Sequence, residues 1–220
     1  LAVQQLDRIL AIVMQANVVR QENIELALAT EFRVGFYVGK DNTPNKISKN
    51  EKLSSRGERQ QNLDLLLESD QDTLNEYYRF IDKCPCCGKK MINVRFNKER
   101  WVLEHICDNP DCPADVLPLF IVDSEIYRYL PSIVVSTIDK MSLIGISNEF
   151  KALFGQVKCY CPIHGFSTGS KCTCAESGCS GRVQAVGYLK DPVPTLFIQD
   201  EMHLIKESLG TVSYTHLTLP

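Results

Sequence analysis

Two cysteine clusters with a shared plan constrain this chain more than any other feature of its sequence. Each begins with Cys-Pro-x-(Cys or His)-Gly and continues, after an interval, with Cys-x₄-Cys. Two ligands in a tight turn, followed by a second pair, are typical of structural zinc sites, in which four protein ligands leave no open position. We therefore expect two structural Zn²⁺ ions. The predicted ligands are Cys84, Cys87, Cys107 and Cys112 for the first ion, and Cys161, His164, Cys174 and Cys179 for the second.

The clusters leave some cysteines without an assigned role. Cys86, Cys159 and Cys172 are left over. The spacing does not decide between Cys159 and Cys161, or between Cys172 and Cys174, as ligands. Buried free thiols are the simplest alternative to metal at either cluster. An iron–sulfur cluster is the rival metal site, because thiolates serve iron as well as zinc. The turn-forming pairs and the histidine of the second set favour zinc.

Composition limits the class of protein. The chain has 220 residues, of which 44% are apolar and 23% charged, with a formal net charge of −3. This is enough for one α/β core with small attachments, and it argues against a broadly basic nucleic-acid coat. No apolar stretch approaches the length of a membrane span, so we expect no membrane contact. No secretory signal pattern accompanies the cysteines, which predicts a reducing, cytoplasmic location.

The N-terminal third of the chain predicts helices around one strand. Residues 1–29 carry apolar side chains at helical spacing, with a polar turn at 17–23 separating a second short helix. Apolar residues alternate over 32–39, which predicts a strand with one buried face. Residues 40–60 are rich in lysine and arginine and predict an exposed loop. Helical spacing returns over 63–81.

Two further stretches predict strands. Residues 92–96 and 101–106, between the halves of the first cysteine cluster, predict a hairpin across Asn97-Lys98, as in a zinc ribbon. Residues 132–136 predict a short buried strand that leads into a helix. Thr137 or Asp139 would cap that helix, unless the hydroxyl and the amides of the first turn bind a phosphate.

An acidic pair ends a third apolar run. Residues 196–198 follow two prolines and predict a buried parallel strand that ends at Asp200-Glu201. Parallel strands of open α/β sheets carry functional groups at their carboxyl ends. There, the first carboxylate could hold the Mg²⁺ of a bound nucleotide, and the second could orient or deprotonate the attacking water. The alternative is that Asp200 only caps a helix that begins at Met202.

The tetrad Asp200-Glu201-Met202-His203 resembles the second motif of superfamily-two (DExH-type) helicases. Read whole, residues 1–210 look like the middle of the first RecA-like lobe, a parallel α/β sheet, with two zinc-ribbon-like insertions. More narrowly, the chain is similar to the large helicase-related proteins of DISARM-type bacterial phage defence. The features that carry this narrower resemblance are Gln4-Gln5-Leu6-Asp7-Arg8, Val34-Gly35-Phe36-Tyr37-Val38-Gly39 with Thr43-Pro44-Asn45, Ile126-Tyr127-Arg128, Ser136-Thr137-Ile138-Asp139-Lys140 and Gln199-Asp200-Glu201-Met202-His203.

The resemblance implies a role for several residues. Asp200 would hold the Mg²⁺ of bound ATP, and Glu201 would be the catalytic carboxylate. His203 would couple the nucleotide to the downstream motif. Thr137 would contact the nucleic-acid strand, expected to be DNA, with Lys140 as a weaker candidate. Other proteins of the defence system are the implied partners.

Several parts of the helicase pattern are missing from the sequence. There is no Gly-x-x-x-x-Gly-Lys-Ser/Thr loop, no Ser-Ala-Thr motif and no second lobe with its arginine finger. We therefore expect this fragment alone neither to bind ATP tightly nor to hydrolyse it. The alternative function is a non-catalytic zinc-ribbon module that binds nucleic acid or a partner protein. Residues 212–220 resemble translated sequencing-adapter read-through and are expected to be non-native.

The domain prediction follows these motifs. We expect a RecA-like α/β segment with an exposed loop at 40–60, a first zinc insertion, a RecA-like strand and helix, a second zinc insertion, the strand with the acidic motif, and the tail. Their boundaries are 1–82, 83–116, 117–157, 158–182, 183–211 and 212–220.

Overall fold

The computed structural model describes residues 2–38, 43–47, 71–137, 140, 147–172, 179, 181–190, 196 and 198. The chain is mixed α/β and divides into two compact units. The first unit is Leu1–Ile126 with Pro131–Val135, and the second is Tyr127–Leu130 with Ser136–Pro220. Among the described residues, no helix combines the length and the apolar character needed to cross a bilayer.

The first unit begins with a long helix, α1 (Ala2–Glu22). Leu6, Leu10 and Val13 recur at helical spacing and are buried in the core, which confirms the predicted helix. The predicted turn at 17–23 is wrong, because the helix continues through Asn17. The buried Asn17 side chain donates a hydrogen bond to the carbonyl of Phe32 and accepts one from its amide, each at 2.9 Å.

The second helix expected before residue 29 is also wrong. Residues 24–28 form turns, and the side chains of Ile24 and Leu28 are 91% and 98% exposed. These turns are fixed by a polar side chain, since the buried guanidinium of Arg20 donates to the carbonyls of Ala27 and Ala29 at 3.2 and 2.8 Å. A tertiary contact from α1 therefore determines this segment, and its own apolar residues do not.

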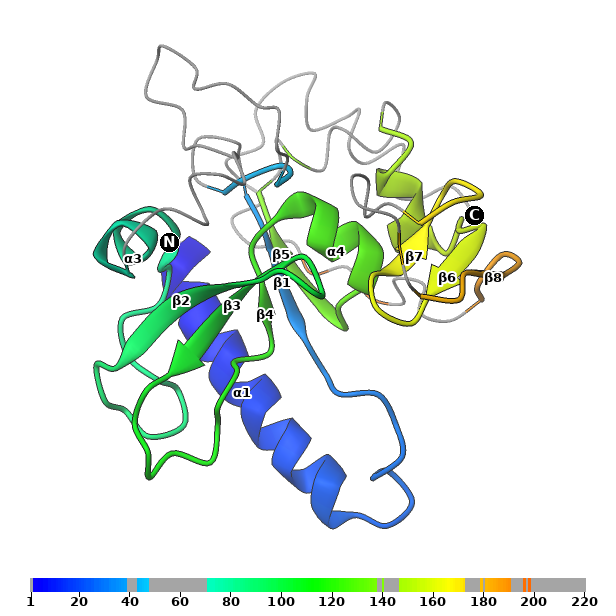
Figure 1. Cartoon of the computed structure of the whole chain (residues 1–220). Coiled ribbons are helices and arrows are strands. Elements are labelled where there is room, and N and C mark those ends of the chain that lie inside the picture. The colour runs from blue at the N-terminus through cyan, green and yellow to red at the C-terminus, as the bar shows by residue number, and fades with distance from the viewer. Residues whose placement is uncertain are drawn as a thin grey trace. The chain divides into compact units, whose positions relative to one another are not determined.

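A three-stranded sheet forms the centre of the first unit, in the order β4-β1-β5 (Figure 1). The strands are β1 (Val34–Tyr37), β4 (Leu119–Phe120) and β5 (Ile133–Ser136), and β1 pairs with β4 in parallel. All of β1 is buried, so the prediction of one buried face is wrong for this central strand. The predicted strand at 132–136 is confirmed, but β5 lies at the sheet edge and Ile133 is 38% exposed.

An antiparallel ribbon packs into the same core. It consists of β2 (Ile92–Asn97) and β3 (Val102–Cys107), paired from Ile92 with Cys107 to Asn97 with Val102, and it confirms the predicted hairpin. The connecting turn ends at Trp101 in a left-handed conformation, with φ 58°. Its indole packs edge-on against Phe96 and donates a hydrogen bond to the carbonyl of Ile47 at 3.2 Å. Ile47 is buried, so the loop expected to be exposed is partly core.

Two helices flank the ribbon, α3 (Gln71–Tyr78) and α4 (Asp123–Tyr129). Glu125 of α4 is fully buried and accepts a hydrogen bond from the Leu103 amide at 2.8 Å. His105 Nε2 lies 3.1 Å from the Tyr78 carbonyl at the end of α3. Burial lowers the pKa of His105 to about 4, so the imidazole is neutral and Nε2 is the nitrogen that donates. Helix α3 falls within the predicted helical range 63–81, of which residues 63–70 lie outside the described part.

The second unit carries a small antiparallel sheet in the order β7-β6-β8, drawn in yellow and orange in Figure 1. Its strands are β6 (Cys159–Cys161), β7 (Gly165–Ser167) and β8 (Gln184–Ala185). Tyr160 and Phe166 pair across β6 and β7 with ring centroids 4.9 Å apart. A 3₁₀ helix, η2 (Phe150–Phe154), precedes the sheet and buries Phe150.

The predicted buried strand at 196–198 is contradicted at two of its three residues. Leu196 and Ile198 lie outside any strand, and their side chains are 73% and 85% exposed. A run this short does not specify a strand, and the two preceding prolines remove backbone donors from any ladder. Phe197 and residues 199–203 lie outside the described residues.

Candidate metal centres

The sulfur atoms of the first cluster converge on a single point. Those of Cys84, Cys87, Cys107 and Cys112 all lie within 4.8 Å of one another. The Cys84–Cys112 and Cys87–Cys107 separations are 3.7 and 3.8 Å, and none of these cysteines forms a disulfide. A tetrahedral ion with Zn–S bonds of about 2.3 Å requires sulfur–sulfur edges of about 3.8 Å. The four thiols could therefore hold one metal ion.

A turn at Gly88 places the first two sulfurs. The Gly88 amide donates to the Cys84 carbonyl at 2.8 Å, and the Cys84 amide donates to the Lys89 carbonyl at 2.9 Å. Gly88 has φ +70°, and no atom lies within 4 Å of the position that a Cβ would occupy. Its backbone conformation, and not a lack of space, therefore favours glycine here.

The end of the ribbon places the other two sulfurs. Cys107 is the last residue of β3, and a turn in which the Cys112 amide donates to the Asn109 carbonyl at 2.9 Å brings the second sulfur back. Lys89 Nζ donates to Asn109 Oδ1 at 2.9 Å and thereby ties this turn to the first one. The ligands thus come from two local turns, which the pairing of β2 with β3 brings together.

The thiols of this cluster differ in their acidity. The backbone amide of Lys89 donates to the Cys87 sulfur and lowers the pKa of that thiol to about 7. Burial raises the pKa of Cys84, and it raises that of Cys107 to about 12. Since metal binding requires thiolates, a bound cation would supply the positive charge that these buried groups lack.

The second cluster closes in the same way, in the second unit. Cys161 Sγ, His164 Nδ1 and Cys179 Sγ lie 3.3 to 3.5 Å from one another. With Zn–S and Zn–N bonds of about 2.3 and 2.0 Å, a tetrahedral ion requires sulfur–nitrogen edges of about 3.5 Å. The sulfur of Cys172 completes a group whose ligand atoms all lie within 4.8 Å of one another. This group could also hold a metal ion.

The fourth member of that group differs from the predicted set. The sequence predicted Cys174 as the fourth ligand and assigned no role to Cys172. The described group contains Cys172, and Cys174 lies outside the described residues. The two cysteines are two positions apart, so spacing alone does not separate them. Of the other cysteines left over, Cys86 is exposed and Cys159 is buried, and neither belongs to a described group.

Two glycines shape the backbone around the second cluster. Gly165, with φ +78°, ends the turn between β6 and β7. The Gly181 amide donates to the Cys179 sulfur at 3.3 Å. A Cβ at Gly181 would lie 2.7 Å from the Cys161 sulfur, so only glycine allows the backbone to approach this closely.

The predicted nucleic-acid residues lie after β5. The Thr137 carbonyl accepts a hydrogen bond from the Lys140 amide at 3.2 Å. The Thr137 hydroxyl is buried without a hydrogen-bond partner among the described residues. The Lys140 side chain is buried. The predicted catalytic residues Asp200, Glu201 and His203 lie outside the part of the chain that the structure describes.

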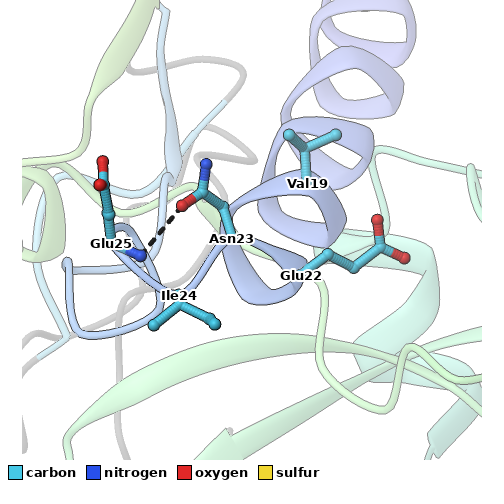
Figure 2. A pocket seen from close by; sticks show the side chains of 5 residues that line it. All are labelled: Val19, Glu22, Asn23, Ile24 and Glu25. Carbon is cyan, nitrogen blue, oxygen red and sulfur yellow. Dashed lines mark hydrogen bonds between the residues drawn. The ribbon is translucent and has the colours of Figure 1, made fainter.

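An open hollow of about 600 Å³ lies at the end of α1. Figure 2 shows its lining, which is Val19, Glu22, Asn23, Ile24 and Glu25. The Asn23 side chain accepts a hydrogen bond from the Glu25 amide at 3.0 Å and so closes the turn that shapes the hollow. None of the predicted site residues lines it.

Comparison with known proteins gives one informative similarity. No protein-family model matches the chain. Over 96% of its length, in an alignment of 229 residues, the chain is 33% identical to the "DISARM protein DrmA" of Bacillus paralicheniformis. It spans 19% of that relative, about a fifth of the relative's length. The chain is therefore similar to one part of a DISARM protein.

Proposed function

We propose that this chain is a zinc-stabilised segment of a phage-defence protein of the DISARM type. The similarity over 96% of the chain to a DISARM protein carries the defence assignment. The two groups of converging ligands support the zinc assignment, because each supplies four sulfur or imidazole ligands at tetrahedral spacing. Four protein ligands fill the coordination of zinc, so both centres would be structural. Each would contribute on the order of 10–16 kcal/mol of binding free energy to folding.

Metal content and colour test the zinc assignment. Protein purified without added metal should contain two equivalents of zinc and should not absorb visible light. A brown protein would contain an iron–sulfur cluster, and fewer than two equivalents of any metal would reject the assignment. Cys87→Ser should lose one equivalent. Cys86→Ser is the matched control and should retain both, because the neighbouring Cys86 side chain is exposed and outside the group.

Two variants, Cys172→Ser and Cys174→Ser, identify the fourth ligand of the second centre. We propose Cys172, on its place in the described group. Cys172→Ser should then release the second zinc, while Cys174→Ser should retain it. The reverse result would return the ligand role to Cys174.

For the whole protein, we propose an ATP-dependent DNA helicase or translocase. Its support is the resemblance of Asp200-Glu201-Met202-His203 to the DExH motif, with Asp200 holding Mg²⁺, Glu201 catalysing hydrolysis and His203 coupling it to movement. Thr137 and Lys140 would contact DNA. The parallel pairing of β1 with β4 is compatible with a RecA-like sheet. Partners would be other proteins of the same defence system.

The test uses the full-length protein. Glu201→Gln should abolish DNA-stimulated ATP hydrolysis and leave ATP binding intact. Glu207→Gln, which changes a nearby carboxylate outside the tetrad, is the control and should keep its turnover. Unchanged hydrolysis in Glu201→Gln would reject the catalytic assignment.

A non-catalytic zinc-ribbon module is the second candidate, favoured because both ligand groups are complete among the described residues. It predicts salt-dependent DNA binding by a full-length protein that hydrolyses no ATP.

A further inference from the structure

The last turn of α4 contacts the backbone of the turn that carries two ligands of the second centre. Tyr129 donates its hydroxyl proton to the Ile163 carbonyl at 2.9 Å. The adjacent Arg128 donates from Nη1 to the His164 carbonyl at 3.4 Å. Both carbonyls belong to the turn between β6 and β7. We propose that Arg128 and Tyr129 are positioning residues for the second zinc centre, an inference that rests on the proposed zinc assignment.

The fit between this helix end and the turn is close enough to exclude a side chain. A Cβ at Gly165 would lie 2.3 Å from the Arg128 carbonyl oxygen and 3.3 Å from the Tyr129 ring. The glycine therefore serves two purposes, a left-handed backbone conformation and direct contact with α4. The corresponding glycine of the first centre, Gly88, has nothing within 4 Å of its Cβ position. This kind of support thus distinguishes the second centre from the first.

The hydrogen bonds from Arg128 and Tyr129 orient the backbone that carries the His164 imidazole. The Ile163 carbonyl belongs to the peptide plane that enters His164, and the His164 carbonyl belongs to the plane that leaves it. Holding both planes fixes the backbone from which the His164 imidazole reaches the metal. Groups that hydrogen-bond directly to a ligating side chain change metal affinity about 10- to 100-fold when they are removed. These contacts are to the ligand's backbone, so the loss of one hydrogen bond should have a smaller effect, about fivefold.

The two donors also contact each other. Arg128 is buried, and its guanidinium lies 5.1 Å from the centroid of the Tyr129 ring. A planar guanidinium stacked on an aromatic ring loses less side-chain freedom when it forms a hydrogen bond. A lysine at position 128 would keep the charge and lose the planar guanidinium that lies over the Tyr129 ring.

Zinc release from the two centres tests the inference. The whole chain, loaded with two equivalents of zinc, is mixed with a chromophoric chelator, and Cys87→Ser and Cys161→Ser assign the two release phases. Tyr129→Phe removes one hydrogen bond and should speed release from the second centre about fivefold, with the first phase unchanged. Arg128→Lys should act in the same direction. Tyr127→Phe, on the same helix and packed against Phe150, is the control and should leave both phases unchanged.

Cobalt provides a readout that general destabilisation would not change. With Co²⁺ in place of zinc, Tyr129→Phe should shift only the visible bands of the second, histidine-containing centre. Unchanged release and unchanged bands in Tyr129→Phe would overturn the inference, as would equal acceleration of both phases. Wild-type protein that binds fewer than two equivalents would overturn the zinc assignment together with the inference. That failure is recognisable, because it is seen before any substitution is made.

Discussion

Two equivalent glycines, Gly88 and Gly165, provide a matched test of what holds each metal centre. Both end the turn that carries the first two ligands, and their φ angles are +70° and +78°. Their surroundings differ, because a Cβ at Gly88 meets nothing within 4 Å, whereas one at Gly165 meets the Arg128 carbonyl oxygen at 2.3 Å. Gly88→Ala and Gly165→Ala therefore impose the same backbone cost and different steric costs.

The magnitudes follow from this geometry. A left-handed conformation costs an alanine about 1–2 kcal/mol, so Gly88→Ala should weaken the first centre by about 5- to 30-fold. At Gly165 the new methyl group must also move about 1 Å or more from a backbone atom. That displacement would break the Tyr129–Ile163 hydrogen bond and lengthen the one from Arg128, each contributing about 0.5–1.5 kcal/mol. The total for Gly165→Ala is about 2–5 kcal/mol.

Zinc affinity, measured at each centre by chelator competition, decides between these values. The assay should show that Gly88→Ala affects only the first centre, and that Gly165→Ala affects only the second and more strongly. If Gly165→Ala retains its second zinc as well as Gly88→Ala retains its first, the close contact with α4 does not support the centre. Loss of both zinc ions in either variant would mean that the two centres do not fold independently.

Three further predictions concern single side chains. Asn17→Ala removes both hydrogen bonds to the Phe32 backbone and should lower the free energy of unfolding by about 1–3 kcal/mol in urea titrations. A change below about 0.5 kcal/mol would contradict the role of Asn17. Burial lowers the pKa of His105 to about 4 in the folded chain, against about 6.5 in the unfolded chain. The free energy of unfolding should therefore stay constant above about pH 6.5 and fall by about 3 kcal/mol as the pH drops from there toward 4. His105→Gln should flatten that part of the pH profile, and an unchanged slope would refute the assignment. Gly181→Ala should expel the second metal, since its Cβ would lie 2.7 Å from the Cys161 sulfur, and zinc analysis that still finds two equivalents would contradict this.

Features set by neighbours in the sequence were predictable. The spacing of the cysteines indicated the first group, Cys84, Cys87, Cys107 and Cys112, and three members of the second, Cys161, His164 and Cys179. The helix α1 and the ribbon β2–β3 follow from apolar periodicity, which is also local. The fourth ligand of the second cluster was not decided by the sequence, because Cys172 and Cys174 are two positions apart; the described group contains Cys172, and Cys174 lies outside the described residues.

Features set by distant partners were not predictable. Asn17 looked like a turn residue, but its amide is satisfied by Phe32, so the helix continues through it. β1 alternates in sequence, yet it is buried on both faces. Val34 and Phe36 lie in the core cluster, and Gly35, which points to the other face, lies against Ile126 and Pro131. At Leu196 the apolar character of the run gave no information about what would cover it, and the side chain is exposed.

The parallel pairing of Val34 with Leu119 joins positions about 85 residues apart, and the first metal centre lies within that interval. Linking Cys84 to Cys112 through a metal removes 28 positions from the loop that this pairing must close. Loop-closure entropy changes only logarithmically with length, so the shortening is worth about 0.4 kcal/mol, or less than twofold in the rate of closure. A metal that is bound early in refolding would therefore hardly hasten formation of the parallel sheet, and its influence on kinetics should lie in how slowly the finished ribbon opens.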